Sequence, residues 1–368
     1  MTTARRWLAV LAATAVLAAL PALVAAVPAR TSDLSAAALL ERITDSAGLP
    51  YSGYAEASGG LALPVTSRFG SIADLFGGRT QLRVWYRSST DWRVDAIGFA
   101  GESDVHHDES GDWSWNYEAN TVDRTGSPVA PQVRLPAAAD LLPTELGRRL
   151  LSQALPREAS RIGSERIAGR SAPGLRITPR QPASTIAAVD VWADAATGLP
   201  LRVRVQGKQS GSAALTSSFL DFSSGLPPAS VTRFLPPVNA RLSDRPFRDL
   251  ATAIDQLGAV VPPARLAGLD RNRQLPAPGS VAVYGRGVTE LVAVPLPDRI
   301  GYSLSQELAD ATGADPNEPR LSLTVGPLTL LLASARQQDA AWLLVGTVTA
   351  ETLAGAAAEL PDHPELNR

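Results

Sequence analysis

Cysteine is absent from this sequence of 368 residues. Its absence excludes disulfides, thiolate metal sites, cysteine nucleophiles and an N-terminal cysteine that carries a lipid. The charges are balanced, with 34 Lys and Arg against 36 Asp and Glu. The basic residues are nearly all Arg, and they do not cluster in one part of the sequence. The sequence lacks the basic patch with which proteins bind nucleic acid, so we expect no nucleic-acid partner.

Motifs of catalysis and metal binding are also missing. The sequence holds no G-x-S-x-G nucleophile elbow, and Gly285-Arg286-Gly287 lacks the third glycine of a dinucleotide loop. His106 and His107 are adjacent on a predicted strand, so they point to opposite faces and are poorly placed to share one ion. They stand just before a turn, where we expect solvated side chains. The sequence thus predicts a protein that is not an enzyme, with no metal and no cofactor.

The N-terminal residues 1–30 predict export. Arg5 and Arg6 precede an uncharged run from Trp7 to Ala29, and small residues follow. The arginines favour the cytoplasmic side, which places the rest of the chain outside the cytoplasmic membrane. A helix over the uncharged run would be about 35 Å long, enough to cross a bilayer. Both a cleaved signal peptide and a retained signal anchor are therefore open.

Alternating hydrophobicity is the main pattern that is present. The sequence has 29 Gly and 29 Pro, which favour many short strands over long helices. Residues 81–98 alternate apolar and polar side chains. In residues 111–117 (GDWSWNY), aromatic rings stand at positions 113, 115 and 117. Such segments predict an antiparallel meander with one apolar and one wet face. Helical periodicity predicts helices over 34–47 and 139–155 that cover part of the apolar face.

A change of sequence pattern near residues 226–240 indicates a domain boundary. Two double-proline pieces, GLPPAS and FLPPVNA, end the strand-rich region. Beyond them, strand patterns and two helical patterns, residues 302–313 and 349–360, predict a small α+β domain. The expected organisation is a signal peptide or anchor over 1–30, a β-rich domain over 31–238 and a C-terminal domain over 239–368.

The segment order over residues 36–238 resembles the LolA/RseB-like envelope proteins, in the actinobacterial branch with a MucB/RseB N-terminal-type domain. The resemblance rests on these pieces in this order: YSGYAEASGGLALP, GGRTQLRVWYRSSTDWRVD, SDVHHDESGDWSWNYEANTVDR, LLPTELGRRLLSQAL, RIAGRSAPGLRITPR and VDVWADAATGLPLRVRV. The last two are the most specific. The C-terminal domain resembles the second domain of RseB more loosely.

The resemblance implies an unclosed antiparallel β half-barrel with a helical cover. Its members bind acyl chains or lipidated molecules in the concave face, and RseB restrains the proteolysis of an anti-sigma factor. The candidate cavity residues are the apolar side chains of the helical and strand patterns, for each of which a plain core role stays equally open: Leu61, Leu63, Phe69, Ile72, Phe76, Leu82, Val84, Tyr86, Trp92, Val94, Trp113, Trp115 and Val191.

The expected function is therefore the binding or sensing of a lipid or an acylated protein in the cell envelope, without catalysis. The alternative is a regulatory protein that docks a membrane-bound anti-sigma factor or an ABC-type transporter and binds no lipid. A retained N-terminal segment would add association with the membrane.

Overall fold

The computed structural model describes Trp7, Thr14 and residues 29–61, 75–98, 101–126, 136–209, 211–245, 261–273, 280–316, 318–333 and 341–361. Most of the predicted signal segment, residues 1–30, lies outside the described residues. No helix within the described part is long and apolar enough to cross a membrane.

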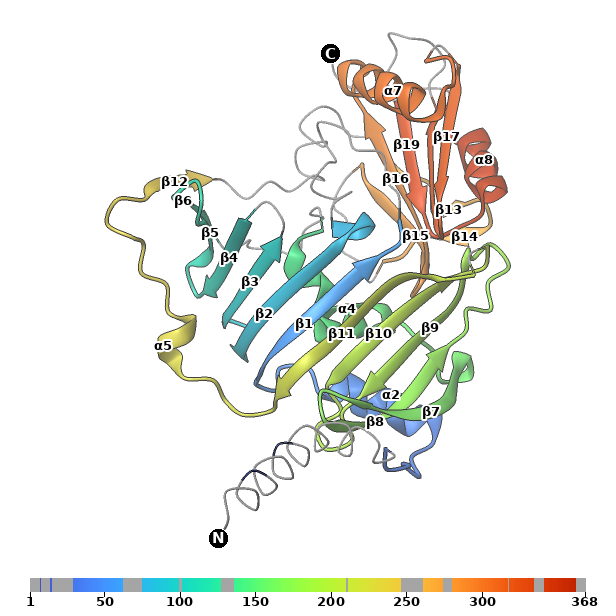
Figure 1. The fold of residues 1–368 in the computed structure, drawn as a ribbon. Coiled ribbons are helices and arrows are strands. Elements are labelled where there is room, and N and C mark those ends of the chain that lie inside the picture. The colour runs from blue at the N-terminus through green and yellow to red at the C-terminus, as the bar shows by residue number, and fades with distance from the viewer. Residues whose placement is uncertain are drawn as a thin grey trace.

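A 12-stranded sheet forms the larger part of the fold (Figure 1). Neighbouring strands pair antiparallel except β12 and β6, which are parallel. In spatial order the strands are β12 (Arg241–Arg245), β6 (Thr121–Gly126), β5 (Gly111–Asn116), β4 (Gly101–Asp108), β3 (Asp91–Gly98), β2 (Arg79–Ser88), β1 (Tyr51–Gly59), β11 (Ala213–Ser223), β10 (Pro200–Gly207), β9 (Ile186–Ala193), β8 (Arg170–Ile177) and β7 (Ala159–Ile167).

The sheet is open. Within the described residues its edge strands β12 and β7 do not pair with each other. Figure 1 shows the sheet curving, with α2 (Ala36–Asp45) and α4 (Pro143–Leu151) against one face. We call this helix-covered face the inner face and its opposite the outer face. The prediction of an unclosed, mainly antiparallel sheet with a helical cover is confirmed.

The two covering helices form where their sequence patterns place them. Ser35 caps α2 by accepting a hydrogen bond from the Ala38 amide at 3.1 Å. Pro143 begins α4, where a missing amide hydrogen costs nothing. Gly147 lets α4 approach β10 closely, because a Cβ atom there would lie 2.9 Å from the Pro200 ring. The 3₁₀ helices η1 (Ala138–Leu141) and η2 (Pro156–Glu158) flank α4.

The main core lies between these helices and the inner face. Leu39 and Ile43 of α2 and Leu146 of α4 pack in one cluster with buried residues of the sheet, among them Leu82, Val84, Val94, Leu175, Val191, Val203 and Phe219. Each large apolar side chain buried in this way contributes about 1.5–3 kcal/mol. The core therefore holds the helices on the inner face and fixes which residues of each strand point inward.

A five-stranded sheet forms the C-terminal part. Its order is β15 (Ala282–Arg286), β16 (Thr289–Leu296), β19 (Ala341–Gly346), β18 (Leu328–Ala333) and β17 (Arg320–Val325). Helix α8 (Ala350–Glu359) packs with Trp342 and Leu344, whereas α7 (Asp298–Thr312) packs with Ala341 and Leu343. Because side chains alternate along β19, the two helices cover opposite faces. A hairpin of β13 (Arg265–Leu266) and β14 (Leu269–Asp270) adjoins this sheet.

The two sheets contact each other through named bonds. The Arg286 guanidinium donates to both carboxylate oxygens of Glu158, at 2.5 and 3.1 Å. An isolated bridge joins Ser184 to Val348, and the Thr185 amide donates to the Thr347 carbonyl at 3.0 Å.

A strap of residues 224–240 connects β11 to β12 on the outside of the large sheet (Figure 1). It contains α5 (Ala229–Thr232), which lies against β2 and β3. Strand β12 follows the boundary expected at residue 238, yet it pairs with β6 of the first sheet. The division of the chain into domains stays a prediction.

Candidate ligand cavity

A cavity of about 550 Å³ lies between the inner face and the helices that cover it. The sheet contributes Tyr51, Val84, Tyr86, Trp92 and Val94 to its wall. The remaining wall comes from the helices and connecting segments, chiefly Ile43, Leu49, Leu142, Thr144, Glu145, Arg148, Leu199 and Pro200. Its volume falls within the range of about 300–1,000 Å³ that small-molecule sites occupy.

Aromatic rings stiffen the sheet side of the cavity. The rings of Tyr51 and Tyr86, on neighbouring strands, stack at 5.3 Å between centroids. Trp92 stacks on His107 of β4 at 5.1 Å. Pairs of this geometry are worth about 0.5–1.5 kcal/mol beyond their buried area. The rings are thus held by their neighbours before any ligand arrives.

The polar groups of the cavity wall gather mainly where α4 begins, and Ser46 and Ser89 add hydroxyls elsewhere on the wall. The hydroxyls of Tyr51 and Thr144 share a hydrogen bond of 2.6 Å, and both residues are buried. Burial raises the pKa of Tyr51 far above its usual range. Arg148 donates to Glu145 at 2.5 Å, and this bond raises the pKa of Arg148. The arginine side chain is about half exposed, so the charged pair marks the solvent side of the cavity.

This arrangement suits non-covalent binding. A tyrosine whose pKa is raised stays protonated, so Tyr51 serves as a hydrogen-bonding hydroxyl and not as a base. Among the described residues, the Thr144 hydroxyl bonds to the Tyr51 hydroxyl and to no base that would activate it. The described wall therefore combines a large apolar surface with a few fixed polar groups, as ligand sites do.

Four of the predicted cavity residues line this cavity together: Val84, Tyr86, Trp92 and Val94. Leu82 and Val191 are fully buried in the main core, and Phe76 packs against that core. These three residues contribute to the core and do not reach the cavity wall. For these three candidates, the alternative of a plain core role therefore holds.

Leu61 lies elsewhere. Its side chain meets Gly326 in the hairpin between β17 and β18, where a Cβ atom on the glycine would come within 2.6 Å of it. Leu61 therefore contacts the C-terminal sheet and not the cavity. Leu63, Phe69 and Ile72 lie outside the described residues.

Trp113 and Trp115 were predicted for the cavity, and the strand register corrects this. Val94 pairs with Val105, and Val105 pairs with Ser114, so Ser114 points to the inner face. Its two neighbours must then point outward, because successive side chains alternate. The ring of Trp113 lies beside that of Phe234 in the strap, with 5.7 Å between centroids, and the ring of Trp115 lies beside that of Tyr117, with 5.4 Å between centroids.

His106 was expected to be solvated, and this was wrong. It does lie on the opposite face from His107, as predicted, but it is only 4% exposed. Its Nδ1 bonds to the Thr232 carbonyl at 2.8 Å, and its ring contacts Phe234. The strap thus covers a face that the strand pattern alone marks as wet, and burial lowers the pKa of His106.

Tyr51, Thr144 and Arg148 were missed as cavity residues. Tyr51 opens a strand of mostly small residues (YSGYAEASG), and Thr144 and Arg148 lie within a helix that was read for its leucines. The signal for Tyr51 was its place at the start of the central strand, where its ring reaches both neighbouring strands. No signal in the sequence marks Thr144 or Arg148.

A second group that sequence reasoning missed lies on the outer face. Asp95 and Asp104 pair directly across β3 and β4, and both are almost fully buried. Arg93 bonds to both carboxylates. Burial and the nearby charge of Asp95 raise the pKa of Asp104 to about 6. Alternation alone assigned Asp95 to a solvated face.

The geometry thus defines an open, helix-covered β-sheet protein with an apolar cavity on its inner face. No family model matches the sequence, and no curated protein matches it. Solved structures do match. MucB in complex with MucA(peri) has a TM-score of 0.48 at 16% identity, over 88% of this chain and 97% of that chain. The MucA/MucB complex from Pseudomonas aeruginosa has a TM-score of 0.49 at 16% identity, over 88% of this chain and 96% of that chain.

A LolA superfamily protein from Nitrosomonas europaea also matches, with a TM-score of 0.25 at 10% identity, over 55% of this chain and 98% of that chain. The solved structures that this chain is similar to thus include MucB and a LolA superfamily protein, the two kinds of protein named in the sequence resemblance.

Proposed function

We propose that this protein binds the acyl chain of a lipid or of an acylated protein in the inner-face cavity, without catalysis, in the cell envelope. The observation that carries the proposal is the cavity of about 550 Å³ with Val84, Trp92 and Val94 on its sheet side. An acyl chain is the ligand whose chemistry matches such a wall, because apolar burial is its main source of affinity.

The size of the cavity suits the affinity that such a role needs. Each buried methylene contributes about 0.8 kcal/mol, so about ten methylenes supply about 8 kcal/mol. That free energy corresponds to a dissociation constant of about 1 μM before the costs of ordering the chain. A carrier or sensor must release its ligand again, and this affinity permits release.

The polar side of the cavity supports one orientation of the ligand. Arg148 and Glu145 stand at the solvent side, and Asp140 lies in the same stretch of wall. A head group would lie beside these charges, and the acyl chain would extend toward Trp92 and Val94. The uncharged run after Arg5 and Arg6 supports the location in the envelope.

Native mass spectrometry of protein purified from a lipid-containing host tests the proposal. We expect an acyl species bound to the wild-type chain and lost from Trp92→Ala, whose ring lines the cavity. Trp113→Ala is the matched control, because it removes another partly buried tryptophan from the outer face of the same sheet. A fluorescent fatty acid should likewise bind the variant Trp92→Ala at least tenfold more weakly than the control.

Two results would refute this reading. The first is the absence of any acyl species together with no binding of the fluorescent fatty acid. The second is an equal loss in both tryptophan variants, which would show that binding does not depend on the inner face.

The second candidate function is docking of a membrane protein, either an anti-sigma factor or a transporter. It is favoured by exposed apolar side chains on the strap and β12: Leu235 is 77%, Val238 100% and Leu242 60% exposed. A purified membrane partner that binds the chain stoichiometrically, and is lost from Leu242→Asp while acyl content is unchanged, would support it.

A further inference from the structure

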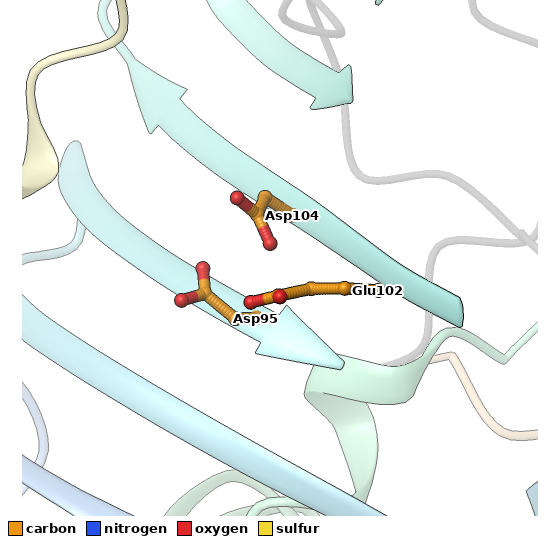
Figure 2. A group of neighbouring side chains, drawn as sticks. All are labelled: Asp95, Glu102 and Asp104. Carbon is orange, nitrogen blue, oxygen red and sulfur yellow. The ribbon is translucent and has the colours of Figure 1, made fainter. Parts of the chain in front are cut away.

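Three carboxylates converge on the outer face, at the end of the β3–β4 hairpin. Asp95 belongs to β3, and Glu102 and Asp104 belong to β4. One oxygen from each lies within 4.8 Å of the other two. Figure 2 shows the three carboxyl groups turned toward a common space between the two strands.

The charges of this cluster do not balance. Arg93 donates to both oxygens of Asp95, at 2.6 and 3.0 Å, and to Oδ2 of Asp104 at 2.9 Å. One guanidinium thus serves two carboxylates, and Glu102 adds a third. Asp95 is 1% and Asp104 4% exposed. Buried charge of this kind is costly unless it is paired or bound to a metal.

An unsatisfied atom points to what is missing. Oδ1 of Asp104 is buried and, among the described residues, has no hydrogen-bond partner. A buried acceptor without a partner costs about 1–3 kcal/mol, and more when it is charged. Trp115 on β5 stands opposite Asp104, and its indole Nε1 is likewise buried without a partner among the described residues. Arg83 stands opposite Asp95 on β2, but its side chain is exposed to solvent.

We propose that Asp95, Glu102 and Asp104 bind a divalent cation of the calcium type. Opposite oxygens around a calcium ion are about 5 Å apart, because each Ca–O distance is about 2.3–2.6 Å. Oxygens within 4.8 Å of one another can therefore share one ion. The ion would supply the missing partner of Asp104 Oδ1 and the second positive charge of the cluster.

The donor set selects calcium over other metals. All three ligands are carboxylate oxygens, which suit hard cations and not zinc or copper. Magnesium requires nearly ideal octahedral geometry and is usually held by one or two carboxylates with several waters. Three protein carboxylates on a hairpin, with water completing the shell, fit the larger and more tolerant ion. Arg93 then acts as the group that orients two of the ligands.

A bound ion would tie β3 to β4 behind the cavity wall. Val94 lines the cavity on the inner face, and the next residue, Asp95, is a ligand on the outer face. The site is chemically separate from the acyl site, and its test does not depend on whether the chain binds lipid.

The experiment uses the full chain after treatment with a chelator. Calcium chloride is titrated by isothermal calorimetry into the wild type, Glu102→Gln and Asp104→Asn. Glu109→Gln is the control, because that carboxylate lies in the exposed turn at the other end of β4. We expect one ion per chain, binding at least tenfold weaker in both ligand variants, and no change in the control. Luminescence of Tb³⁺ excited through tryptophan gives a second readout, since Trp115 pairs with Asp104.

The outcomes decide the proposal even if one variant does not fold. Glu102 is only partly buried, so Glu102→Gln serves alone if Asp104→Asn is unfolded. Wild-type affinity in Glu102→Gln, or no saturable binding at millimolar calcium, would overturn the site. Tighter binding of magnesium chloride than of calcium chloride would overturn the choice of ion.

Discussion

Asp190 of β9 is the carboxylate whose replacement should destabilise the fold most clearly. It is 0% exposed and accepts hydrogen bonds from Arg176 at 2.6 and 2.9 Å and from Arg204 at 2.8 Å. Burial acts to raise its pKa, but the bonds and charges of the two arginines lower it below the usual range. We choose the change Asp190→Asn, which keeps the shape and removes the charge.

The expected loss of stability in Asp190→Asn depends on how exposed Arg176 and Arg204 are. Removing one member of a buried ion pair costs about 3–5 kcal/mol when the other stays buried and unpaired. The arginine side chains are 36% and 38% exposed, so water partly replaces the lost carboxylate. We therefore expect a loss of about 2–4 kcal/mol at pH 7, which lowers the Tm by about 6–12 °C for a unit of this size.

The pH dependence gives the prediction its sign. The pKa of Asp190 is lower in the folded state than in the unfolded state, where it is about 4. Ionised Asp190 therefore stabilises the fold fully above pH 4, and this stabilisation is lost as the pH falls through the pKa of the folded state. Urea unfolding of wild type and variant at a series of pH values measures the difference. Asp91→Asn is the control, because the Asp91 carboxylate is 39% exposed in its pair with Arg87, and it should lower the stability by less than about 1 kcal/mol. A cost for Asp190→Asn equal to that of the control, or unchanged well below pH 4, would refute the reasoning.

Three further predictions concern the cavity and the C-terminal sheet. Tyr51→Phe should cost about 1–2 kcal/mol because it leaves the buried Thr144 hydroxyl without its partner, and adding Thr144→Val should restore part of that loss in thermal unfolding. Gly147→Ala, usually favourable in a helix, should instead cost about 1–3 kcal/mol by pushing α4 off Pro200, and should weaken fatty-acid binding with it. Burial raises the pKa of Glu290 to about 7, so Glu290→Gln should stabilise the chain at pH 8 and have little effect at pH 5; an equal gain at both values would contradict this.

Strand positions and faces could be predicted from the sequence where alternation is strong. Val84 and Tyr86 on one strand and Trp92 and Val94 on the next share a face in the pattern, and the register places them together in the cavity wall. The helix expected over 349–360 is likewise present as α8, and Thr349 caps it by accepting a hydrogen bond from the Thr352 amide. Both features depend on residues close together in the chain, so the local sequence is enough to predict them.

The relation between strands could not be read in the same way. Nothing in GDWSWNY tells whether Trp113 shares a face with Val94, because that depends on the pairing with β4. His106 and Asp95 looked solvated because their burial depends on packing from segments distant in the chain, as the contact of His106 with Thr232 of the strap shows. The alternation of side chains shows which residues of one strand share a face. Packing against distant segments decides which of the two faces is exposed to water.

The strand order has a consequence for how the protein folds. Strands β2 to β6 and β7 to β11 are two meanders whose neighbours follow one another in the chain, whereas β1 pairs with β11, as Ser52 with Ser223. Local hairpins close early because their loops are short, and pairings between distant segments come late. The cavity takes Trp92 from the first meander and Pro200 from the second. We therefore expect the cavity to form only when the two halves join, so that ligand binding reports on the completed fold.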